Sequence, residues 1–257
     1  MSPLVEEFPV EVGGRRVMAR LVQPPPDRLA PRPGLLISLA SDRVTAQTVH
    51  PYSIGTEVFV GRGHRAVSVD LPHHGERVDA DGEGIVGFRN AFVAGRDPFA
   101  RLVEEGRALV DLCLARGLAE AGRIVVDGTS RGGYMALRLM AGDPRIRAGA
   151  AHAPVTDWRI LREFAADRDR QDVADLRLTR YVDQLAGRPA HLAIGNHDER
   201  VSTAACCRLY LALDDANRER GLTEGGVEFL CTPDEGHSLG DEWRRRGIEF
   251  LLRQVEA

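Results

Sequence analysis

Short apolar runs alternate with longer amphipathic segments through most of this 257-residue chain, and this alternation limits the folds that the chain can adopt. Residues 35–39 and 66–70 are two such runs, and the segment between them is long enough for a helix. A strand that is followed by a helix and a second strand normally places both strands parallel in one sheet. The alternation therefore predicts an α/β fold, in which helices flank a mostly parallel sheet.

The same pattern continues to the end of the chain. Further strands are expected at 124–127, 148–153, 191–194 and 227–231, and helices at 45–60, 97–116, 130–140, 202–220 and 239–255. Asp97 and Pro98 mark the clearest helix start, because an N-cap aspartate accepts hydrogen bonds from free amides and proline is tolerated in the first turn.

The first part of the chain has a different pattern. Two alternating segments, 8–12 and 17–22, flank a Gly-Gly pair, which predicts an antiparallel hairpin and brings the sheet to eight strands. Residues 73–96 are rich in glycine, aspartate and arginine and are expected to form a loop excursion above the sheet. The strongly charged residues 158–187 predict a small helical cap or, as the alternative, a plain solvated helical face.

Composition excludes several classes of protein. With 43% hydrophobic residues the chain can bury a core, and its formal net charge of -4 does not favour nucleic-acid binding. We find no signal-peptide pattern and no run of about 18 apolar residues, so we expect neither export nor a membrane partner. The four cysteines match no metal-binding or disulfide framework, which favours a reducing, cytoplasmic setting. We expect one domain over 1–257 and leave a homo-oligomer open.

The most informative segment joins an apolar strand to a helix at 128–132, where the chain reads Gly-Thr-Ser-Arg-Gly. Gly-x-Ser-x-Gly in this setting is typical of a nucleophile elbow, a turn so tight that side chains two residues before and after the serine would collide with their surroundings. The turn exposes the hydroxyl of Ser130 above a helix N-terminus, which favours developing negative charge. The alternative is a chance match, or a tight turn without chemistry.

A serine nucleophile needs a base, and the base needs an acid that orients it. Asp198 and His237 lie in the loops that follow the last two expected strands. Because the carboxyl ends of parallel strands meet at one edge of a sheet, the sequence predicts that Ser130, Asp198 and His237 converge there. Glu199 and Asp127 are competing candidates for the acid.

These features resemble the α/β-hydrolase superfamily, and more narrowly its prolyl-oligopeptidase-like and dienelactone-hydrolase-like branch. The segments that carry the resemblance are VVDGTSRGGYMA, AVSVDLPHHGER, AHAPVTDW, IGNHDERV and DEGHS. The resemblance implies that Ser130 is the nucleophile, that His237 is the general base and then the general acid, and that Asp198 orients the imidazole.

The resemblance also implies an oxyanion hole built from two backbone N–H groups. The first belongs to Arg131, directly after the nucleophile. The loop that supplies the second often carries His-Gly in the family, but this chain reads ISLASD there, so Ala40 is the first candidate donor and Leu39 the next. The side chain of Arg131 could also contact an acidic substrate, although a surface ion pair is the expected role.

Several side chains near the same sheet edge are candidates for the pocket lining: Leu39, His73, His74 and Trp158. A polar loop is the alternative role for the two histidines, and core packing is the alternative for Trp158. We expect no metal and no cofactor. A small cap together with the excursion at 73–96 predicts a small or medium acyl compound as the substrate.

We therefore expect a serine hydrolase that cleaves an ester, thioester or lactone through an acyl-enzyme on Ser130. A peptidase or amidase of the prolyl-oligopeptidase type and a non-catalytic binding protein are the alternatives. A metallophosphoesterase is a remote one, suggested by the sequence GNHD at 195–198. Its two-metal centre also needs an Asp-x-His motif, and the nearest match, Asp70 to His73, is one residue too long.

Overall fold

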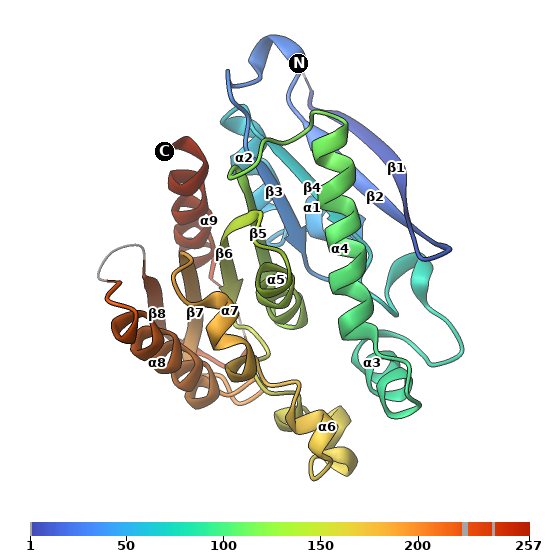
Figure 1. The fold of residues 1–257 in the computed structure, drawn as a ribbon, viewed down its shortest axis with the longest axis vertical. Helices are drawn as coiled ribbons and strands as arrows, with labels where there is room; N and C mark the ends of the chain where they lie inside the picture. Colours follow the sequence, from blue (N-terminus) through green and yellow to red (C-terminus); the bar gives the residue numbers. More distant parts are fainter. Residues whose placement is uncertain (1, 223–225, 238–239) are drawn as a thin grey trace.

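The computed structural model describes residues 2–222, 226–237 and 240–257, and its centre is an eight-stranded sheet (Figure 1). The order across the sheet is β1-β2-β4-β3-β5-β6-β7-β8. The strands are β1 (Leu4–Val12), β2 (Arg15–Gln23), β3 (Leu35–Leu39), β4 (Arg65–Val69), β5 (Ile124–Thr129), β6 (Ile146–His152), β7 (Ala190–His197) and β8 (Val227–Glu235). The pairs β1–β2 and β2–β4 are antiparallel and the remaining pairs are parallel, which confirms the predicted sheet and its N-terminal hairpin.

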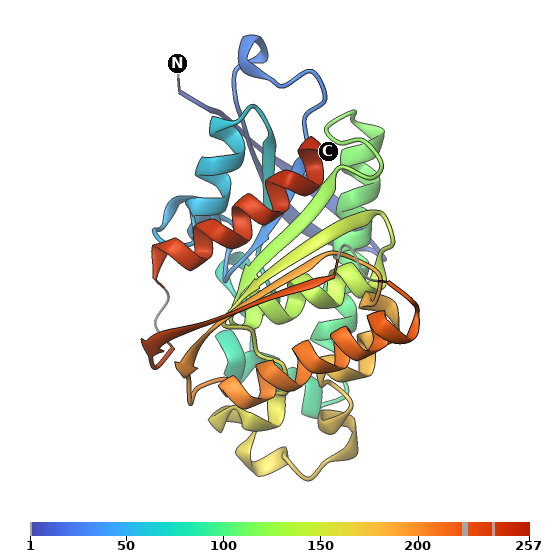
Figure 2. The same ribbon diagram turned by 90° about the vertical axis from the view of Figure 1, so that its left-hand side faces the viewer.

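Helices cover both faces of this sheet (Figure 2). Those that pack on one face are α1 (Arg43–Thr48), α2 (Ile54–Gly61) and α9 (Asp241–Glu256). Those on the other face are α4 (Pro98–Ala115), α5 (Arg131–Gly142) and α8 (Thr203–Glu219). The expected start of the last helix, at residue 239, lies outside the described residues. This three-layer arrangement confirms the α/β-hydrolase fold class.

Apolar side chains fill the space between the sheet and each helical layer. Leu36, Ile54 and Ile248 belong to the cluster under α2 and α9, whereas Ile37, Leu109 and Leu139 belong to the larger cluster under α4 and α5. Neighbouring positions on β3 thus point to opposite faces, as the two-residue repeat of a strand requires. None of the described helices is both long enough and apolar enough to cross a membrane.

Helix α4 begins where the sequence predicts. The carboxylate of Asp97 accepts hydrogen bonds from the amides of Phe99 and Ala100 at 2.9 and 3.0 Å, and Pro98 occupies the first turn. Both features satisfy or remove amides that have no acceptor inside the helix. They place the helix against β1 and α5.

Two expectations for the first half of the chain are wrong. The single helix at 45–60 is two helices, α1 and α2, because Pro51 cannot donate a hydrogen bond and disfavours helical backbone at the residue before it. The segment 73–96 contains a 3-10 turn (Gly75–Arg77) and a regular helix, α3 (Gly84–Val93). The buried residues Phe88 and Ala91 stand at helical spacing in α3, but the surrounding glycines and charges hide that period.

A small helical insertion is present at 158–187, as expected, although it contains only short pieces. They are 3-10 turns at Trp158–Ile160, Arg162–Asp167 and Leu178–Tyr181, with two single-turn helices, α6 (Gln171–Ala174) and α7 (Val182–Leu185). The insertion lies beside α3, at the lower end of Figures 1 and 2. The Nε atom of Arg89 on α3 donates to an Asp167 carboxylate oxygen at 2.6 Å, so the two excursions are joined.

Candidate active site

Ser130 stands at the sharp turn between β5 and α5. Its backbone φ is 56° and its ψ is -118°, a conformation that residues with side chains rarely adopt. A Cβ atom on Gly128 would lie 2.3 Å from the carbonyl oxygen of Gly132, and a Cβ on Gly132 would lie 2.1 Å from the carbonyl oxygen of Leu39. Only glycine fits at both positions, which is the physical requirement of a nucleophile elbow.

The loops after β7 and β8 bring an acid and a base to this serine. The Nε2 atom of His237 lies 3.0 Å from Oγ of Ser130, and its Nδ1 atom lies 2.7 Å from Oδ2 of Asp198. In the chain, His237 follows Ser130 by 107 residues and Asp198 by 39 residues. The three side chains therefore meet because the strands that carry them end at the same edge of the sheet. A carboxylate can only accept a hydrogen bond, so Nδ1 carries the proton and Nε2 presents its lone pair to the serine hydroxyl.

Asp198 is held by the turn that follows it. Its Oδ1 atom accepts hydrogen bonds from the amides of Arg200 and Val201 at 2.9 and 3.1 Å, and its own amide donates to Thr203 Oγ1 at 3.1 Å. Asp198 is 3% exposed, whereas 28% of the His237 side chain is exposed. The acid is therefore fixed and shielded, while the base remains open to a substrate.

The two competing acids lie elsewhere. Glu199 is exposed, and no bond to His237 is described for it. Asp127 is buried beneath α2 and α9, where a Cβ on Gly55 would lie 3.5 Å from its Oδ2 atom. Burial raises the pKa of Asp127 to about 7. The geometry thus joins Asp198, and neither of its competitors, to the imidazole.

The turn also positions the amides expected to bind an oxyanion. Arg131 is the first residue of α5, so its N–H has no acceptor within the helix. Ala40 directly follows the end of β3, and its Cα atom would lie 3.1 Å from a Cβ on Gly132. Leu39 pairs with Gly128 in the sheet. Ala40 remains the predicted second donor and Leu39 the next.

The candidates for the pocket lining have different surroundings. Trp158 is 0% exposed and packs edge-on against Phe99 and Tyr134, so its role is core packing and it cannot form an open wall in this structure. His73 is 5% exposed and its Nδ1 atom lies 3.1 Å from an Asp79 oxygen. His74 is equally buried, and its Nδ1 atom donates to a backbone carbonyl oxygen.

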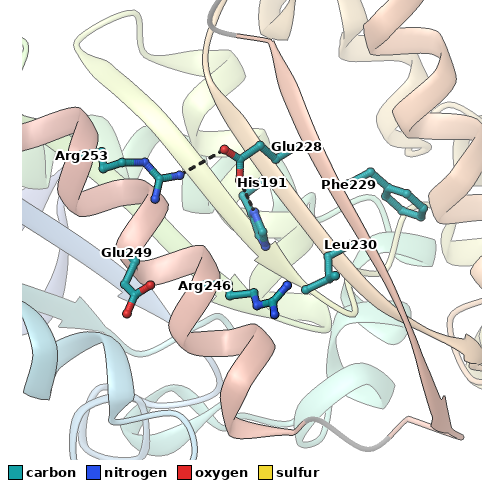
Figure 3. Close-up of a pocket in the computed structure, with 7 residues that line it drawn as sticks. All are labelled: His191, Glu228, Phe229, Leu230, Arg246, Glu249 and Arg253. Carbon is teal, nitrogen blue, oxygen red and sulfur yellow. Dashed lines mark hydrogen bonds and ion pairs between the residues drawn. The ribbon is translucent and has the colours of Figure 1, made fainter.

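A hollow of about 510 Å³ between β8 and α9 is separate from this site (Figure 3). Figure 3 shows Glu228 between Arg253 and His191. One carboxylate oxygen of Glu228 forms an ion pair with Arg253 at 3.1 Å, and the other forms a hydrogen bond with His191 Nδ1 at 3.2 Å. None of Ser130, Asp198 and His237 lines it. The hollow is therefore not the place where the serine meets a substrate.

The residues behind the metallophosphoesterase alternative do not form a ligand set. Asn196 and His197 are exposed. Asp70 forms an ion pair with Arg43, with 2.7 Å between the carboxylate and the guanidinium. Across the described ranges, the group of possible metal ligands that lies close together is His73, Asp79 and Asp81. Arg96 forms an ion pair with Asp81, which already neutralises part of that group.

Sequence reasoning missed some residues that hold the site together. The carbonyl oxygen of His152 accepts the amide of Ser130 at 2.8 Å, and the amide of Val155 donates to the carbonyl oxygen of Ser130 at 3.0 Å. These bonds depend on backbone from the end of β6, and side-chain identity gives no signal for them. The hydroxyl of Thr203, by contrast, follows an aspartate by five residues at a helix start, a pattern that could have been recognised.

Comparisons with known proteins agree with this geometry. Residues 82–256 match the model of the prolyl oligopeptidase family. Esterase YjfP of Escherichia coli is 25% identical over 71% of this chain and 78% of its own length. A cold-adapted esterase from an Arctic intertidal metagenomic library superposes with a TM-score of 0.72 at 22% identity, over 99% of this chain and 95% of that one.

A peptidase shares the same fold over a smaller part of its length. The acylaminoacyl peptidase of Pyrococcus horikoshii superposes with a TM-score of 0.70 at 12% identity, and 99% of this chain covers 40% of that protein. At these identities the structural matches establish the fold, and the family match establishes descent. The chain belongs to the prolyl oligopeptidase family and is a hydrolase of the α/β-hydrolase type.

Proposed function

We propose that this protein hydrolyses a small or medium carboxylic ester, thioester or lactone through an acyl-enzyme on Ser130. The observation that supports it is the continuous hydrogen-bond chain from Ser130 through His237 to Asp198, with distances of 3.0 and 2.7 Å. A binding protein without catalysis does not need a strained serine that is hydrogen-bonded to a partly exposed imidazole, which is in turn hydrogen-bonded to a shielded carboxylate.

The proposed reaction has two stages. Nε2 of His237 takes the hydroxyl proton while Oγ of Ser130 attacks the carbonyl carbon, and the resulting oxyanion is bound by the amides of Arg131 and Ala40. Collapse breaks the bond to the leaving alcohol or thiol, which receives the proton from His237. A water molecule then attacks the acyl-enzyme, with His237 again removing and returning the proton, and releases the acid and the free serine.

Asp198 supports both stages without accepting the proton itself. It holds the imidazole with the Nδ1–H group directed away from the serine, and it stabilises the imidazolium that forms. The two amides at 200 and 201 fix this carboxylate, so the ring orientation is set before substrate arrives.

Esters are preferred to peptides in this proposal because of how the relatives match. Esterase YjfP and the cold-adapted esterase are covered over 78% and 95% of their lengths, whereas only 40% of the acylaminoacyl peptidase is covered. The insertion at 158–187 is small, which suits a compact acyl compound. A peptidase or amidase remains the second candidate, since the family includes proteins of that name.

The experiment is a substrate panel with matched variants. We expect p-nitrophenyl esters of graded acyl length to be hydrolysed faster than aminoacyl p-nitroanilides, and Ser130→Ala and His237→Ala to lower kcat by several orders of magnitude. Faster cleavage of the anilides would transfer the proposal to the peptidase class. Full ester activity in Ser130→Ala would exclude the serine mechanism.

Two further parts of the proposal concern the whole chain. The free thiols of Cys113, Cys206, Cys207 and Cys231 are consistent with the reducing, cytoplasmic location that we propose. The continuous sheet with helices on both faces supports a single domain over 1–257. The oligomeric state is open to direct measurement by light scattering.

A further inference from the structure

Arg131 has a second feature besides its backbone amide: a positive charge for which no ion pair with a described residue is found. Its Nε atom is buried and has no hydrogen-bond partner. Its guanidinium forms no ion pair within residues 2–222, 226–237 and 240–257, and the side chain is only partly exposed. The expected surface ion pair is therefore not found, which reopens the alternative role at the substrate.

Partial burial separates Arg131 from the other arginines that lack a described hydrogen bond or ion pair. Those others are exposed, so water solvates their charge. They are Arg28, Arg107, Arg147, Arg168, Arg208 and Arg245. A charge withdrawn from water without a partner is costly, and at a reaction site such a group is a candidate for ligand binding.

The guanidinium lies among the loops at the carboxyl edge of the sheet. The ionisable groups that act on it are Tyr52, between α1 and α2, and three charged residues in loops. These are Arg200 after β7, Asp42 after β3 and Glu83 after β4. Burial lowers the pKa of Arg131, but a guanidinium remains protonated at physiological pH. A permanent positive charge is thus held one residue from the nucleophile.

The neighbouring charged groups have other partners or stand apart. The Oδ1 atom of Asp42 accepts hydrogen bonds from two amides at the start of α1, at 3.1 and 2.8 Å. Arg200 forms two hydrogen bonds with the carboxylate of Glu163, at 2.9 and 2.8 Å. Glu83 forms no described ion pair with Arg131. Glu83 is exposed, so water solvates its charge, whereas Arg131 is only partly exposed and no ion pair is described for it.

His74 supplies a second unpartnered group in the same region. Its Nδ1 atom lies 2.8 Å from the carbonyl oxygen of Pro72, which can only accept, so Nδ1 carries the proton. The Nε2 atom of His74 is buried and has no partner. Burial, reinforced by the charge of Arg131, lowers the pKa of this imidazole to about 4, so it is neutral near pH 7 and Nε2 is a free acceptor.

We propose that Arg131 is a specificity-determining residue that binds a carboxylate on the acyl part of the substrate, so that the favoured substrates are half-esters of dicarboxylic acids. This inference rests on the proposed esterase function and adds the substrate class. The planar guanidinium matches a carboxylate through two parallel N–H···O bonds. His74 is neutral near pH 7, so it adds no second charge beside this guanidinium.

The test compares two esters of equal shape. Mono-p-nitrophenyl adipate ends in a carboxylate, and p-nitrophenyl 6-methylheptanoate replaces it with a neutral branched group. We expect the ratio of kcat/KM for the two, corrected for spontaneous hydrolysis, to favour the adipate in the natural chain and to fall about 10- to 100-fold in Arg131→Gln. Arg147→Gln is the matched control, because Arg147 is exposed near the amino end of β6, away from the site.

A second measurement does not depend on turnover. Free adipate should slow the labelling of Ser130 by a fluorophosphonate in the natural chain and in Arg147→Gln, and should lose this protection in Arg131→Gln. Neutral adipamide should protect none of the three. Labelling of Ser130 without protection by adipate, together with equal kcat/KM ratios in all three chains, overturns the inference and leaves the esterase proposal intact.

Two other outcomes are also decisive. The first is that Arg131 forms a purely structural ion pair with Glu83. In that case Arg131→Gln and Glu83→Gln lower the Tm by similar, non-additive amounts and leave the kcat/KM ratio of the two esters unchanged. That result refutes the role of Arg131 in substrate binding. Absence of both labelling and ester hydrolysis would refute the proposed function itself, and the substrate class with it.

Discussion

Replacing Gly132 with alanine adds a methyl group where the backbone of β3 already lies. The added Cβ would be 2.1 Å from the carbonyl oxygen of Leu39 and 2.7 Å from its carbonyl carbon. Ordinary van der Waals contact begins at 3.4 Å, so the two backbones must separate by about 1.3 Å, from 3.4 minus 2.1. This separation moves Arg131, at the start of α5, away from Ala40. The amides of these two residues are the expected oxyanion donors.

The expected cost has two parts. Overpacking in a core costs about 1–3 kcal/mol, and a contact between two backbones belongs at the upper end of that range. At about 2–4 °C per kcal/mol for a domain of this size, the Tm should fall by roughly 6–12 °C. A displacement of about 1 Å at a reaction site costs on the order of 100-fold in rate, so kcat/KM should fall by that factor in Gly132→Ala.

Two neighbouring substitutions serve as controls. A Cβ on Gly133, in the same helix, would lie 3.1 Å from its nearest neighbour, so a milder loss is expected. A Cβ on Gly61, at the end of α2, has nothing within 4 Å. Thermal unfolding followed by circular dichroism and p-nitrophenyl ester hydrolysis well below the lowest Tm measure both parts. If Gly132→Ala has the same Tm and the same kcat/KM as Gly61→Ala, the close approach of Gly132 to β3 does not constrain the elbow.

Three further predictions concern charged groups. Asp198→Asn should lower kcat by about 10³- to 10⁴-fold with little change in Tm, because it disturbs the imidazole tautomer; an unchanged kcat would require another acid. Asp97→Ala should lower the free energy of unfolding by about 1 kcal/mol in urea titrations through loss of the α4 N-cap, and an unchanged value would contradict that role. Burial raises the folded-state pKa of Asp127 from 3.8 to about 7, so the folded form keeps a proton that the unfolded form loses, and stability should decline as pH rises from about 4 to about 7. Asp127→Asn should therefore gain stability over the natural chain across that range, by as much as about 4 kcal/mol at pH 8, whereas a pH-independent difference would refute the shift.

The catalytic edge could be predicted from sequence because its constraints are local. Gly128 and Gly132 are required by contacts at 2.3 and 2.1 Å, and a strand and a helix flank them directly. The loops after β7 and β8 reach Ser130 because parallel strands end at one edge, which needs only the order of the elements. The Asp97 cap is equally local, since its acceptors are the next amides along the chain.

Other features depend on contacts between distant segments. Phe88 stabilises helix α3 by packing against Phe99 and Trp158. Phe99 precedes β5 in the sequence and Trp158 follows it, so no periodicity near 84–93 reveals those partners. The same packing takes Trp158 out of the pocket wall. The lack of a described ion pair at Arg131 was equally beyond the sequence, because it depends on which partners the carboxylates of the surrounding loops bind.

The most direct test of the account is where a fluorophosphonate attaches. Because the chain contains no lysine, trypsin cuts only after arginine and releases residues 124–131, in which Thr129 and Ser130 are the hydroxyl-bearing residues. We predict one adduct, located on this peptide by mass spectrometry, abolished in Ser130→Ala and formed far more slowly in His237→Ala. An adduct that persists in Ser130→Ala, or rapid ester hydrolysis by a chain that forms none, would contradict the central claim.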